Sequence, residues 1–320
     1  MNKNILVTGC AGFIGFHICN FFLKKGYQIY GVDSITNNYD KKLKEFRLTK
    51  LKNYTNFKFY KFDICKNNKF SNFSKIKYGT IFHFAAQPGV LLSMKRPNLY
   101  YKRNIIGFQN ILDIALINKS NFFFASSSSI YGNQSDYKLN EKMIANPNSI
   151  YGLTKLTNEV IAKILTNGLI NSYALRFFTV YGPYGRPDMA IYKFTKNLMQ
   201  NKKIILRNNG NFYRDFTYID DVTKAIYRLF LHSNKNNESK SLKVLNMGFG
   251  KPIKVSKLVI KLEKHLNKIG KIEKIPEFDN EVLITHSSSS KLFKIIPTFK
   301  LTPLDKGLKK FIDWYKEYTL

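Results

Sequence analysis

Short apolar runs alternate along the first half of this chain with longer segments that read as helices. The apolar runs are typical of buried β-strands, and they cover residues 3–8, 28–32, 57–62, 80–86, 121–125 and 171–178. The segments predicted as helices cover residues 13–25, 37–53, 98–118 and 149–167. Because strands and helices alternate, we expect an α/β fold built on a Rossmann-type doubly wound parallel sheet.

The alternation weakens after residue 178. The elements expected beyond it are a Gly- and Pro-rich loop at 182–187, a turn at 208–210, strands at 214–216, 243–247 and 272–275, helices at 190–200, 219–231, 255–268 and 304–318, and a polar hinge at 233–240. The serine run at 287–290 is expected to be an exposed turn or a helix start. This part of the chain therefore predicts a smaller C-terminal α/β lobe, interleaved with returns to the main domain.

Composition narrows the class of protein. With 44% hydrophobic residues in 320, the chain has ample material for a core. The net charge of +31 would attract anionic ligands, but the lysines are scattered, so we expect no nucleic-acid partner.

Cys10, Cys19 and Cys65 lack the spacing of a metal site, so reduced, buried thiols and no metal are expected. No signal peptide or run of about 18 apolar residues is present, which predicts a cytoplasmic protein without a membrane partner.

A glycine loop lies between the first predicted strand and helix. Gly9, Gly12 and Gly15 allow a tight turn, close backbone approach and exposure of helix N–H groups to a phosphate. The second strand ends at Asp33, whose carboxylate can bind both hydroxyls of an adenosine ribose and would repel a 2′-phosphate. The order of strand, loop and helix predicts a dinucleotide site, the alternative being an ordinary βαβ crossover, and Asp33 favours NAD over NADP.

Tyr151 and Lys155 lie four residues apart in a predicted helix, so both side chains leave the same face. A tyrosine that acts as a base at neutral pH needs its pKa lowered by about 3 units, and a nearby ammonium supplies part of that shift. The same spacing also occurs on solvated helix faces. His83 lies within an apolar run, which favours a hydrogen-bonded core histidine over a catalytic one.

Further stretches carry a family resemblance, at residues 32–33, 38–40, 43–44, 85–87, 89–90, 176–183, 185–190 and 214–221. With the glycine loop, Asp33, the serine run at 126–129 and the Tyr151/Lys155 pair, they make the chain resemble the extended short-chain dehydrogenase/reductase family of nucleotide-sugar epimerases and dehydratases. Within that family the stretches look like those of UDP-glucuronate 4-epimerases. The resemblance extends from residue 3 to the C-terminal helix.

The resemblance implies an NAD-dependent isomerase that inverts C4 of a UDP-hexuronate through a transient 4-keto sugar. Tyr151 would be the base, Lys155 its charged partner, and Ser127 the hydrogen-bond donor to O4. The cofactor-binding residues that it implies are Gly9, Gly12, Phe13, Ile14, Gly15, Asp33, Asp63, Ile64, Phe84, Ala85, Ala86, Asn104, Ser126, Tyr151, Lys155 and Phe178. The substrate-binding residues are Gln87, Ser127, Ser128, Ser129, Thr179, Arg186, Met189 and Arg214.

The resemblance also implies the domain roles and the assembly. Residues 1–178 would form the NAD-binding Rossmann domain, with returns from later segments, and residues 179–320 would form most of the nucleotide-sugar lobe. A homodimer through the helices at 98–118 and 149–167 is expected.

The choice of sugar depends on a few positions. Ser128 and Ser129 stand where dehydratases of the family carry Asp-Glu, and hydroxyls can hold a hexuronate carboxylate without adding like charge. Departures are Leu91 in place of the family's usual Arg, Asn280-Glu281 in place of Gly-Asp, and Ser288 in place of a later Asp. The alternatives are a UDP-glucose or UDP-N-acetylglucosamine 4-epimerase, a C5 epimerase, a non-catalytic NAD-binding protein, and an RNA-binding protein.

Overall fold

The computed structural model describes residues 3–66, 75–134, 138–235, 240–276 and 282–319, and the chain in it divides into two compact units. Unit 1 comprises residues 1–132, 144–177 and 226–245, and unit 2 comprises residues 133–143, 178–225 and 246–320. The departures at Asn280 and Glu281 lie outside the described residues. The domain roles expected for residues 1–178 and 179–320 are not tested by this division and stay a prediction.

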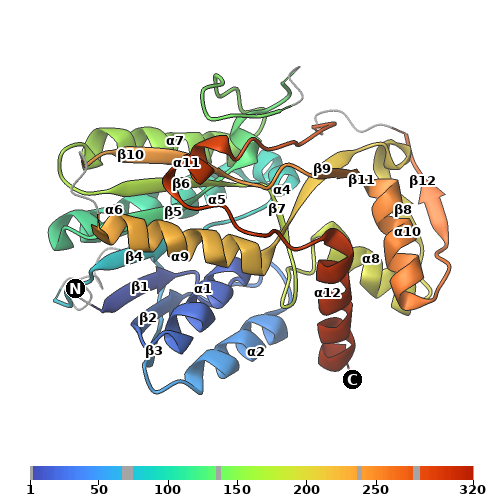
Figure 1. Ribbon diagram of the computed structural model, residues 1–320, viewed down its shortest axis with the longest axis horizontal. Coiled ribbons are helices and arrows are strands. Elements are labelled where there is room, and N and C mark those ends of the chain that lie inside the picture. The colour runs from blue at the N-terminus through green and yellow to red at the C-terminus, as the bar shows by residue number, and fades with distance from the viewer. Residues whose placement is uncertain (1–2, 67–74, 135–137, 236–239, 277–281, 320) are drawn as a thin grey trace. The chain divides into compact units, whose positions relative to one another are not determined.

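Unit 1 is built on a seven-stranded sheet in the order β10–β6–β5–β4–β1–β2–β3 (Figure 1). The strands are β1 (Asn4–Thr8), β2 (Gln28–Asp33), β3 (Phe57–Lys61), β4 (Thr80–His83), β5 (Asn121–Ser127), β6 (Ser172–Phe177) and β10 (Leu242–Met247). Neighbouring strands from β6 to β3 all pair in parallel. The order 3-2-1-4-5-6 is that of a doubly wound nucleotide-binding sheet, so the fold prediction is confirmed.

Helices cover both faces of this sheet, so its central strands β4 and β6 are buried on both sides. They are α1 (Phe13–Lys24), α2 (Lys41–Lys52), α4 (Val90–Lys95), α5 (Pro97–Tyr100), α6 (Gly107–Asn118), α7 (Ile150–Thr166) and the C-terminal part of α9 (Ile219–Lys235). On one face, Phe22 of α1 and Phe230 of α9 pack on Phe82 of β4. On the other, Phe108 of α6 packs on Phe122 and Phe124 of β5.

Several boundaries differ from the sequence prediction, and three of the differences have a clear structural basis. The predicted helix at 98–118 is interrupted by a π-helical turn, η2 (Tyr101–Ile106), which separates α5 from α6 and carries the buried side chain of Asn104. Strand β4 ends at His83, earlier than expected, because residues 84–87 leave the sheet. Helix α9 continues to Lys235, so the predicted hinge is wrong at residues 233–235, and residues 236–239 lie outside the described part of the chain.

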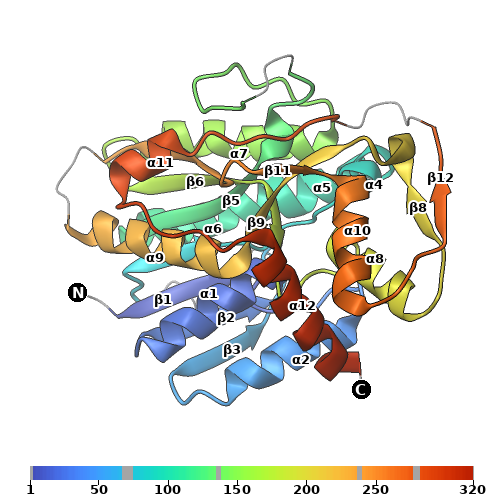
Figure 2. The same cartoon turned by 45° about the vertical axis from the view of Figure 1, so that its right-hand side comes forward.

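Unit 2 contains two small sheets with three longer helices (Figure 2). The sheets are β11–β9–β7 and β12–β8, formed by β7 (Thr179–Tyr181), β8 (Ile204–Leu206), β9 (Tyr213–Tyr218), β11 (Pro252–Lys254) and β12 (Ile272–Lys274). The helices are α8 (Ala190–Met199), α10 (Val255–Leu266) and α12 (Leu304–Thr319), with the short helices η4 (Arg207–Gly210) and α11 (Ser290–Ile295). An aromatic cluster of Tyr192, Phe311, Trp314 and Tyr315 joins α8 to α12.

The centre of unit 2 holds a buried carboxylate. Asp215 is 1% exposed and accepts hydrogen bonds from the main-chain N–H groups of Gly250 at 2.9 Å and Ser287 at 3.1 Å. Burial raises its pKa, and these hydrogen bonds oppose the shift. Ser287 is fully buried, so the expectation of an exposed turn is wrong there, whereas α11 does begin at Ser290 as expected.

Candidate active site

The glycines of the loop in unit 1 stand at positions that have no room for a Cβ atom. Gly9 has a φ of +73°, and a Cβ there would lie 2.7 Å from the main-chain nitrogen of Ala85 and 2.8 Å from the carbonyl carbon of Phe84. A Cβ on Gly15 would collide with the carbonyl oxygen of Gly9. The Gly12 N–H donates to that same oxygen at 2.9 Å. The loop is therefore pressed between β1, helix α1 and the residues that follow β4, which is the close backbone approach that a dinucleotide site requires.

Helix α1 begins directly after this loop. Gly12 is its N-cap, and no side chain of the described residues caps it. The first-turn N–H groups, which include those of Phe13 and Ile14, have no acceptor within the helix, so they and the positive end of the helix dipole can bind a pyrophosphate. The loop and the helix start fit the diphosphate of NAD.

Asp33 lies at the end of β2, next to the glycine loop. Its Oδ2 accepts from Ala11 N–H at 3.2 Å and its Oδ1 from Ile35 N–H at 2.8 Å. A carboxylate has about four acceptor sites, so both oxygens can also accept from ribose hydroxyls. Asp63 is held in a similar way in the loop after β3, where its Oδ1 accepts from Cys65 N–H at 3.0 Å, and Ile64 is buried against Gly107. These positions fit the adenosine half of NAD.

Helix α7 carries Tyr151 and Lys155. Ser149 is its N-cap, and the serine hydroxyl accepts from Gly152 N–H at 3.1 Å. Tyr151 is the second residue of the helix, where the helix dipole favours a negatively charged phenolate. Lys155 is 2% exposed; its Nζ donates to Ala125 O at 2.8 Å and lies 6.0 Å from the centre of the Tyr151 ring. Burial lowers the pKa of Lys155 to about 8.

The serine run lies at the end of β5. The Ser127 hydroxyl accepts from Ser129 N–H at 3.1 Å, and this cap starts a single turn, η3 (Ser128–Ile130). Its Oγ lies 3.2 Å from that of Ser129. The Ser126 hydroxyl instead donates to Glu159 Oε1 at 2.5 Å, inside the core. Unit 1 thus brings the serine run and helix α7 into contact, as expected of a reaction site.

Residues that follow β4 are held by the π-turn. Asn104 accepts from Gln87 N–H at 2.7 Å, and its Nδ2 donates to Gln87 O and to Thr154 Oγ1, both at 3.1 Å. Arg103 donates to Gln87 Oε1 at 2.6 Å. The sequence prediction included Gln87 and Asn104 but missed Arg103 and Thr154, because no spacing rule links a π-turn to a helix about 50 residues later.

Five of the predicted residues lie in unit 2. Thr179 pairs with Phe216 at the start of β7, and Met189 is the N-cap of α8. The Phe178 N–H donates to Met247 O at 3.4 Å. Arg186 makes a two-pronged ion pair with Asp188, with Nη2 2.5 Å from Oδ2. Arg214 donates to the carbonyls of Tyr213 at 3.0 Å and Leu283 at 3.2 Å. The roles of all five residues stay predictions.

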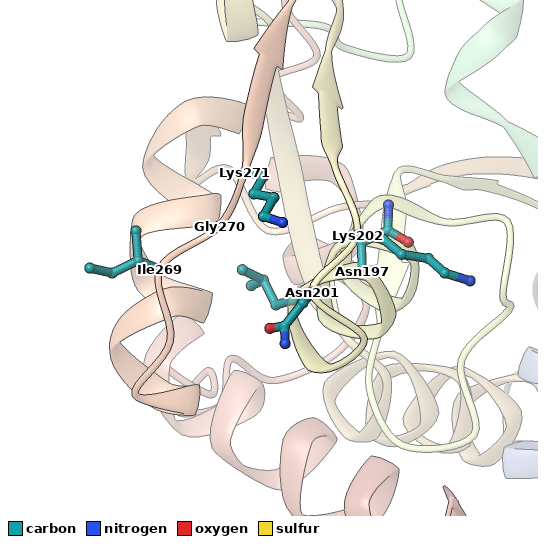
Figure 3. Close-up of a pocket in the computed structure, with 7 residues that line it drawn as sticks. Asn197, Asn201, Lys202, Ile269, Gly270 and Lys271 are labelled. Carbon is teal, nitrogen blue, oxygen red and sulfur yellow. The ribbon is translucent and has the colours of Figure 1, made fainter.

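Unit 2 also contains a small hollow with a volume of about 160 Å³ (Figure 3). It is lined by residues of α8, the turn after it and the segment before β12, namely Asn197, Leu198, Asn201, Lys202, Ile269, Gly270 and Lys271. None of these is a predicted site residue. The hollow is too small for a nucleotide sugar, since ligand pockets measure roughly 300–1,000 Å³.

His83 and the three cysteines are the other titratable groups of unit 1 that the sequence singled out. His83 is buried, its Nδ1 lies 2.8 Å from Thr8 Oγ1, and burial lowers its pKa to about 3, so it is a hydrogen-bonded core residue. The three cysteines are free; Cys10 and Cys19 are buried, but Cys65 is only half-buried, contrary to expectation. The described residues contain no group of three or more His, Cys, Asp or Glu that could hold a metal ion, and none of their helices has the length and apolar character to cross a membrane.

Comparison with known proteins extends these observations. The chain is 35% identical over 317 residues to a UDP-glucuronate 4-epimerase of Thermodesulfobacterium geofontis, covering 98% of this chain and 96% of the relative. It resembles the crystal structure of a UDP-glucuronic acid 4-epimerase from Bacillus cereus in complex with UDP-glucuronic acid and NAD, with a TM-score of 0.89, 30% identity and 98% and 99% of the two chains covered. It also resembles the crystal structure of a UDP-glucose 4-epimerase from Thermotoga maritima with UDP-glucose. The TM-score is 0.89 and the identity 25%, over 99% of this chain and 100% of that chain.

The model of the NAD dependent epimerase/dehydratase family matches residues 5–248, which include the glycine loop, Asp33, the serine run and the Tyr151/Lys155 pair. The predictions of family, enzyme class and cofactor are confirmed. The chain belongs to the NAD dependent epimerase/dehydratase family and is an NAD-dependent epimerase.

Proposed function

We propose that this protein interconverts UDP-glucuronate and UDP-galacturonate by inverting C4 of the sugar. The observation that carries the proposal is the arrangement of helix α7, which presents Tyr151 at its positive end with the Lys155 ammonium one turn away, in contact with the serine run at 126–129. The similarity to two UDP-glucuronate 4-epimerases over 98% of the chain supports the choice of sugar.

Proton transfer is assigned to Tyr151. Its phenolate removes the proton of the sugar 4-OH, and the phenol returns that proton to the same oxygen when the cycle closes. Lys155 favours the phenolate through its positive charge, and Ser127 donates a hydrogen bond to O4. When bound, NAD takes up and gives back a hydride at C4 of the sugar. Between the two transfers the 4-keto sugar turns about its diphosphate link and presents its opposite face.

Substrate recognition is assigned to hydroxyls and guanidinium groups. The hydroxyls of Ser128, Ser129 and Thr179 would donate to the hexuronate carboxylate, and holding it disfavours its loss from the β-keto acid. Arg214 suits the diphosphate because a guanidinium forks onto two phosphate oxygens. Gln87, Arg186 and Met189 are proposed to contact the sugar or nucleotide.

A neutral sugar is the second candidate. Leu91 replaces the arginine that the family usually carries after its Gly-Val element, and its side chain is 49% exposed. An apolar side chain there removes a cation that would favour an anionic sugar. The resemblance to a UDP-glucose 4-epimerase is compatible with this alternative.

One experiment separates the candidates. The purified protein is incubated without added cofactor with UDP-glucuronate, UDP-glucose and UDP-N-acetylglucosamine in turn, and the products are identified by NMR. We expect turnover of UDP-glucuronate; turnover of the neutral sugars alone would refute the uronate assignment. Loss of all turnover with NAD still bound would favour a non-catalytic NAD-binding protein. Tyr151→Phe is expected to abolish turnover and to keep NAD, and retained activity would refute Tyr151 as the base.

We further propose that two copies pair through the helices within 98–118 and 149–167. Leu153, Val160 and Ile164 lie on one side of α7 at helical spacing and are 42%, 49% and 69% exposed. Ile117 of α6 is 68% exposed. Exposed apolar side chains gathered on neighbouring helices indicate an interaction surface, and a second copy of the chain would cover it.

A further inference from the structure

The main chain of Tyr151 is held on both sides by hydroxyl groups. Its N–H donates to Ser93 Oγ at 3.1 Å, and its carbonyl accepts from Thr154 Oγ1 at 2.8 Å. The N-cap Ser149 already receives the N–H of Gly152. Since the first N–H groups of a helix lack partners within it, Ser93 acts as a second cap of α7, supplied from a segment about 58 residues earlier.

The Ser93 hydroxyl both donates and accepts a hydrogen bond. The residue is 0% exposed, and while the oxygen accepts from Tyr151 N–H, the hydroxyl donates to Val90 O at 2.6 Å. The hydroxyl therefore links the start of α7 to the first turn of α4. Residues 87–93, from Gln87 to Ser93, are called the 87–93 segment below.

The beginning of the 87–93 segment is tied to the other side of Tyr151. Asn104 exchanges two hydrogen bonds with the main chain of Gln87, at 2.7 and 3.1 Å, and donates a third to Thr154 Oγ1. The Thr154 hydroxyl in turn donates to the carbonyl of Tyr151. The end of the segment, at Ser93, therefore binds the N–H of Tyr151. Its start, at Gln87, is linked through the side chains of Asn104 and Thr154 to the carbonyl of Tyr151.

The middle of the segment is fixed by Tyr100. Its hydroxyl lies 2.7 Å from each of the carbonyl oxygens of Pro88 and Gly89, and its ring meets the Tyr151 ring edge-on with centroids 6.3 Å apart. Gly89 has a φ of +106°, a backbone conformation that L side chains rarely adopt. Tyr100 is fully buried, so the phenol ring of Tyr151 rests on a side chain that also holds the segment.

We propose that Ser93 is a positioning residue for Tyr151 and that the 87–93 segment and the first turn of α7 move together. A displacement of the segment also displaces the main chain of Tyr151, because Ser93 connects the two at one end and Asn104 and Thr154 connect them at the other. A misplacement of about 1 Å at a reacting group can cost on the order of a hundredfold in rate. This inference rests on the proposed function, in which Tyr151 is the base.

The test compares Ser93→Ala with Thr166→Val. Thr166 lies at the other end of α7, and its buried hydroxyl donates to Ala162 O, so Thr166→Val removes a buried hydroxyl from the same helix far from Tyr151. With the UDP-sugar that the wild type turns over, we expect Ser93→Ala to lower kcat about tenfold, to change KM less than about twofold and to keep bound NAD. Thr166→Val should keep kcat despite a lower melting temperature.

Two results would overturn the inference: a kcat for Ser93→Ala within about twofold of the wild type, or an equal fall in kcat for Thr166→Val. Should Ser93→Ala not fold, Tyr100→Phe carries the test under the same criteria, since it keeps the ring and removes only the hydroxyl from the segment. Tyr151→Phe is measured in parallel. If it retains turnover, the proposed function fails; if it is inactive while Ser93→Ala and Tyr100→Phe behave as wild type, only this inference fails.

Discussion

Arg176 and Glu159 form a buried, two-pronged ion pair in unit 1. Arg176 Nε lies 2.9 Å from Glu159 Oε1 and Nη2 lies 2.7 Å from Oε2, with both side chains at most 7% exposed. Burial alone would lower the pKa of Arg176, but the hydrogen bonds and charge of Glu159 raise it above its usual value. Glu159 also receives the Ser126 hydroxyl, so the pair supports the strand end that carries Ser127.

Breaking this pair is expected to destabilise the fold. Glu159→Gln leaves a buried guanidinium without its countercharge, which costs about 3–5 kcal/mol of unfolding free energy in urea denaturation. Glu273→Gln is the control, because Lys203–Glu273 is an exposed pair, 71% and 46% exposed, and should change stability by less than about 1 kcal/mol. Equal effects of the two substitutions would contradict a special role for the buried pair.

The buried Lys155 should make stability depend on pH. Its pKa is lowered to about 8 in the folded protein, against about 10.4 in an unfolded chain. Below pH 8 the Lys155 amine is protonated in both states, and the folded state bears the cost of a buried charge. As the pH rises from about 8 to about 10, the folded state loses this proton before the unfolded state does, so the free energy of unfolding rises. In nucleotide-free protein, Lys155→Met should therefore stabilise relative to wild type more at pH 7 than at pH 10, by about 2–4 kcal/mol. An unfolding difference independent of pH would refute the lowered pKa.

The glycine loop gives a prediction for cofactor binding. Gly15→Ala would drive a Cβ into the Gly9 carbonyl, so the loop must move and we expect NAD to be lost, as measured in nucleotide extracted from the purified protein. Gly168→Ala is the control: its φ of +72° imposes a backbone cost that Gly15→Ala does not carry, but its Cβ would meet no atom within 4 Å, so NAD should be kept. NAD retained by Gly15→Ala at the wild-type level would argue against this loop as the phosphate site.

The proposed dimer predicts that a single substitution in its interface halves the molecular mass of the particle in solution. Ile164→Glu places a charge on the apolar side of α7 and should convert the dimer to a monomer in light scattering. Ile260→Glu changes a similar residue, 61% exposed on α10 in unit 2, and should leave the mass unaltered. A monomeric wild type would overturn the proposal before either variant is made.

Much of unit 1 follows from local patterns. The doubly wound parallel sheet, the glycine loop and the position of Asp33 could be predicted because apolar runs mark buried strands and because the loop has a fixed place in a βαβ unit. The pairing of Tyr151 with Lys155 followed from helical spacing. Side-chain partners were harder: the contacts of Ser93 with Tyr151, of Arg103 with Gln87 and of Thr154 with Asn104 join positions that are 58, 16 and 50 residues apart in the sequence.

The errors have physical causes too. A helical pattern over 98–118 cannot reveal the extra residue of a π-turn, since the turn depends on the partners that Asn104 finds at Gln87 and Thr154. The serine run at 287–290 is polar, which predicted an exposed turn. Ser287 is buried because its N–H reaches the Asp215 carboxylate, a partner about 70 residues away in the sequence.

Helix α9 starts in unit 2 and ends in unit 1, and β10 is divided between the same units at Leu245. The chain passes from one unit to the other five times, so no single cut releases either as a continuous polypeptide. A fragment ending at residue 178 would lack β10 and the end of α9, and would expose Phe22 and Phe82 where Phe230 packs. The C-terminal half of the chain therefore cannot be exchanged between relatives as a self-contained module.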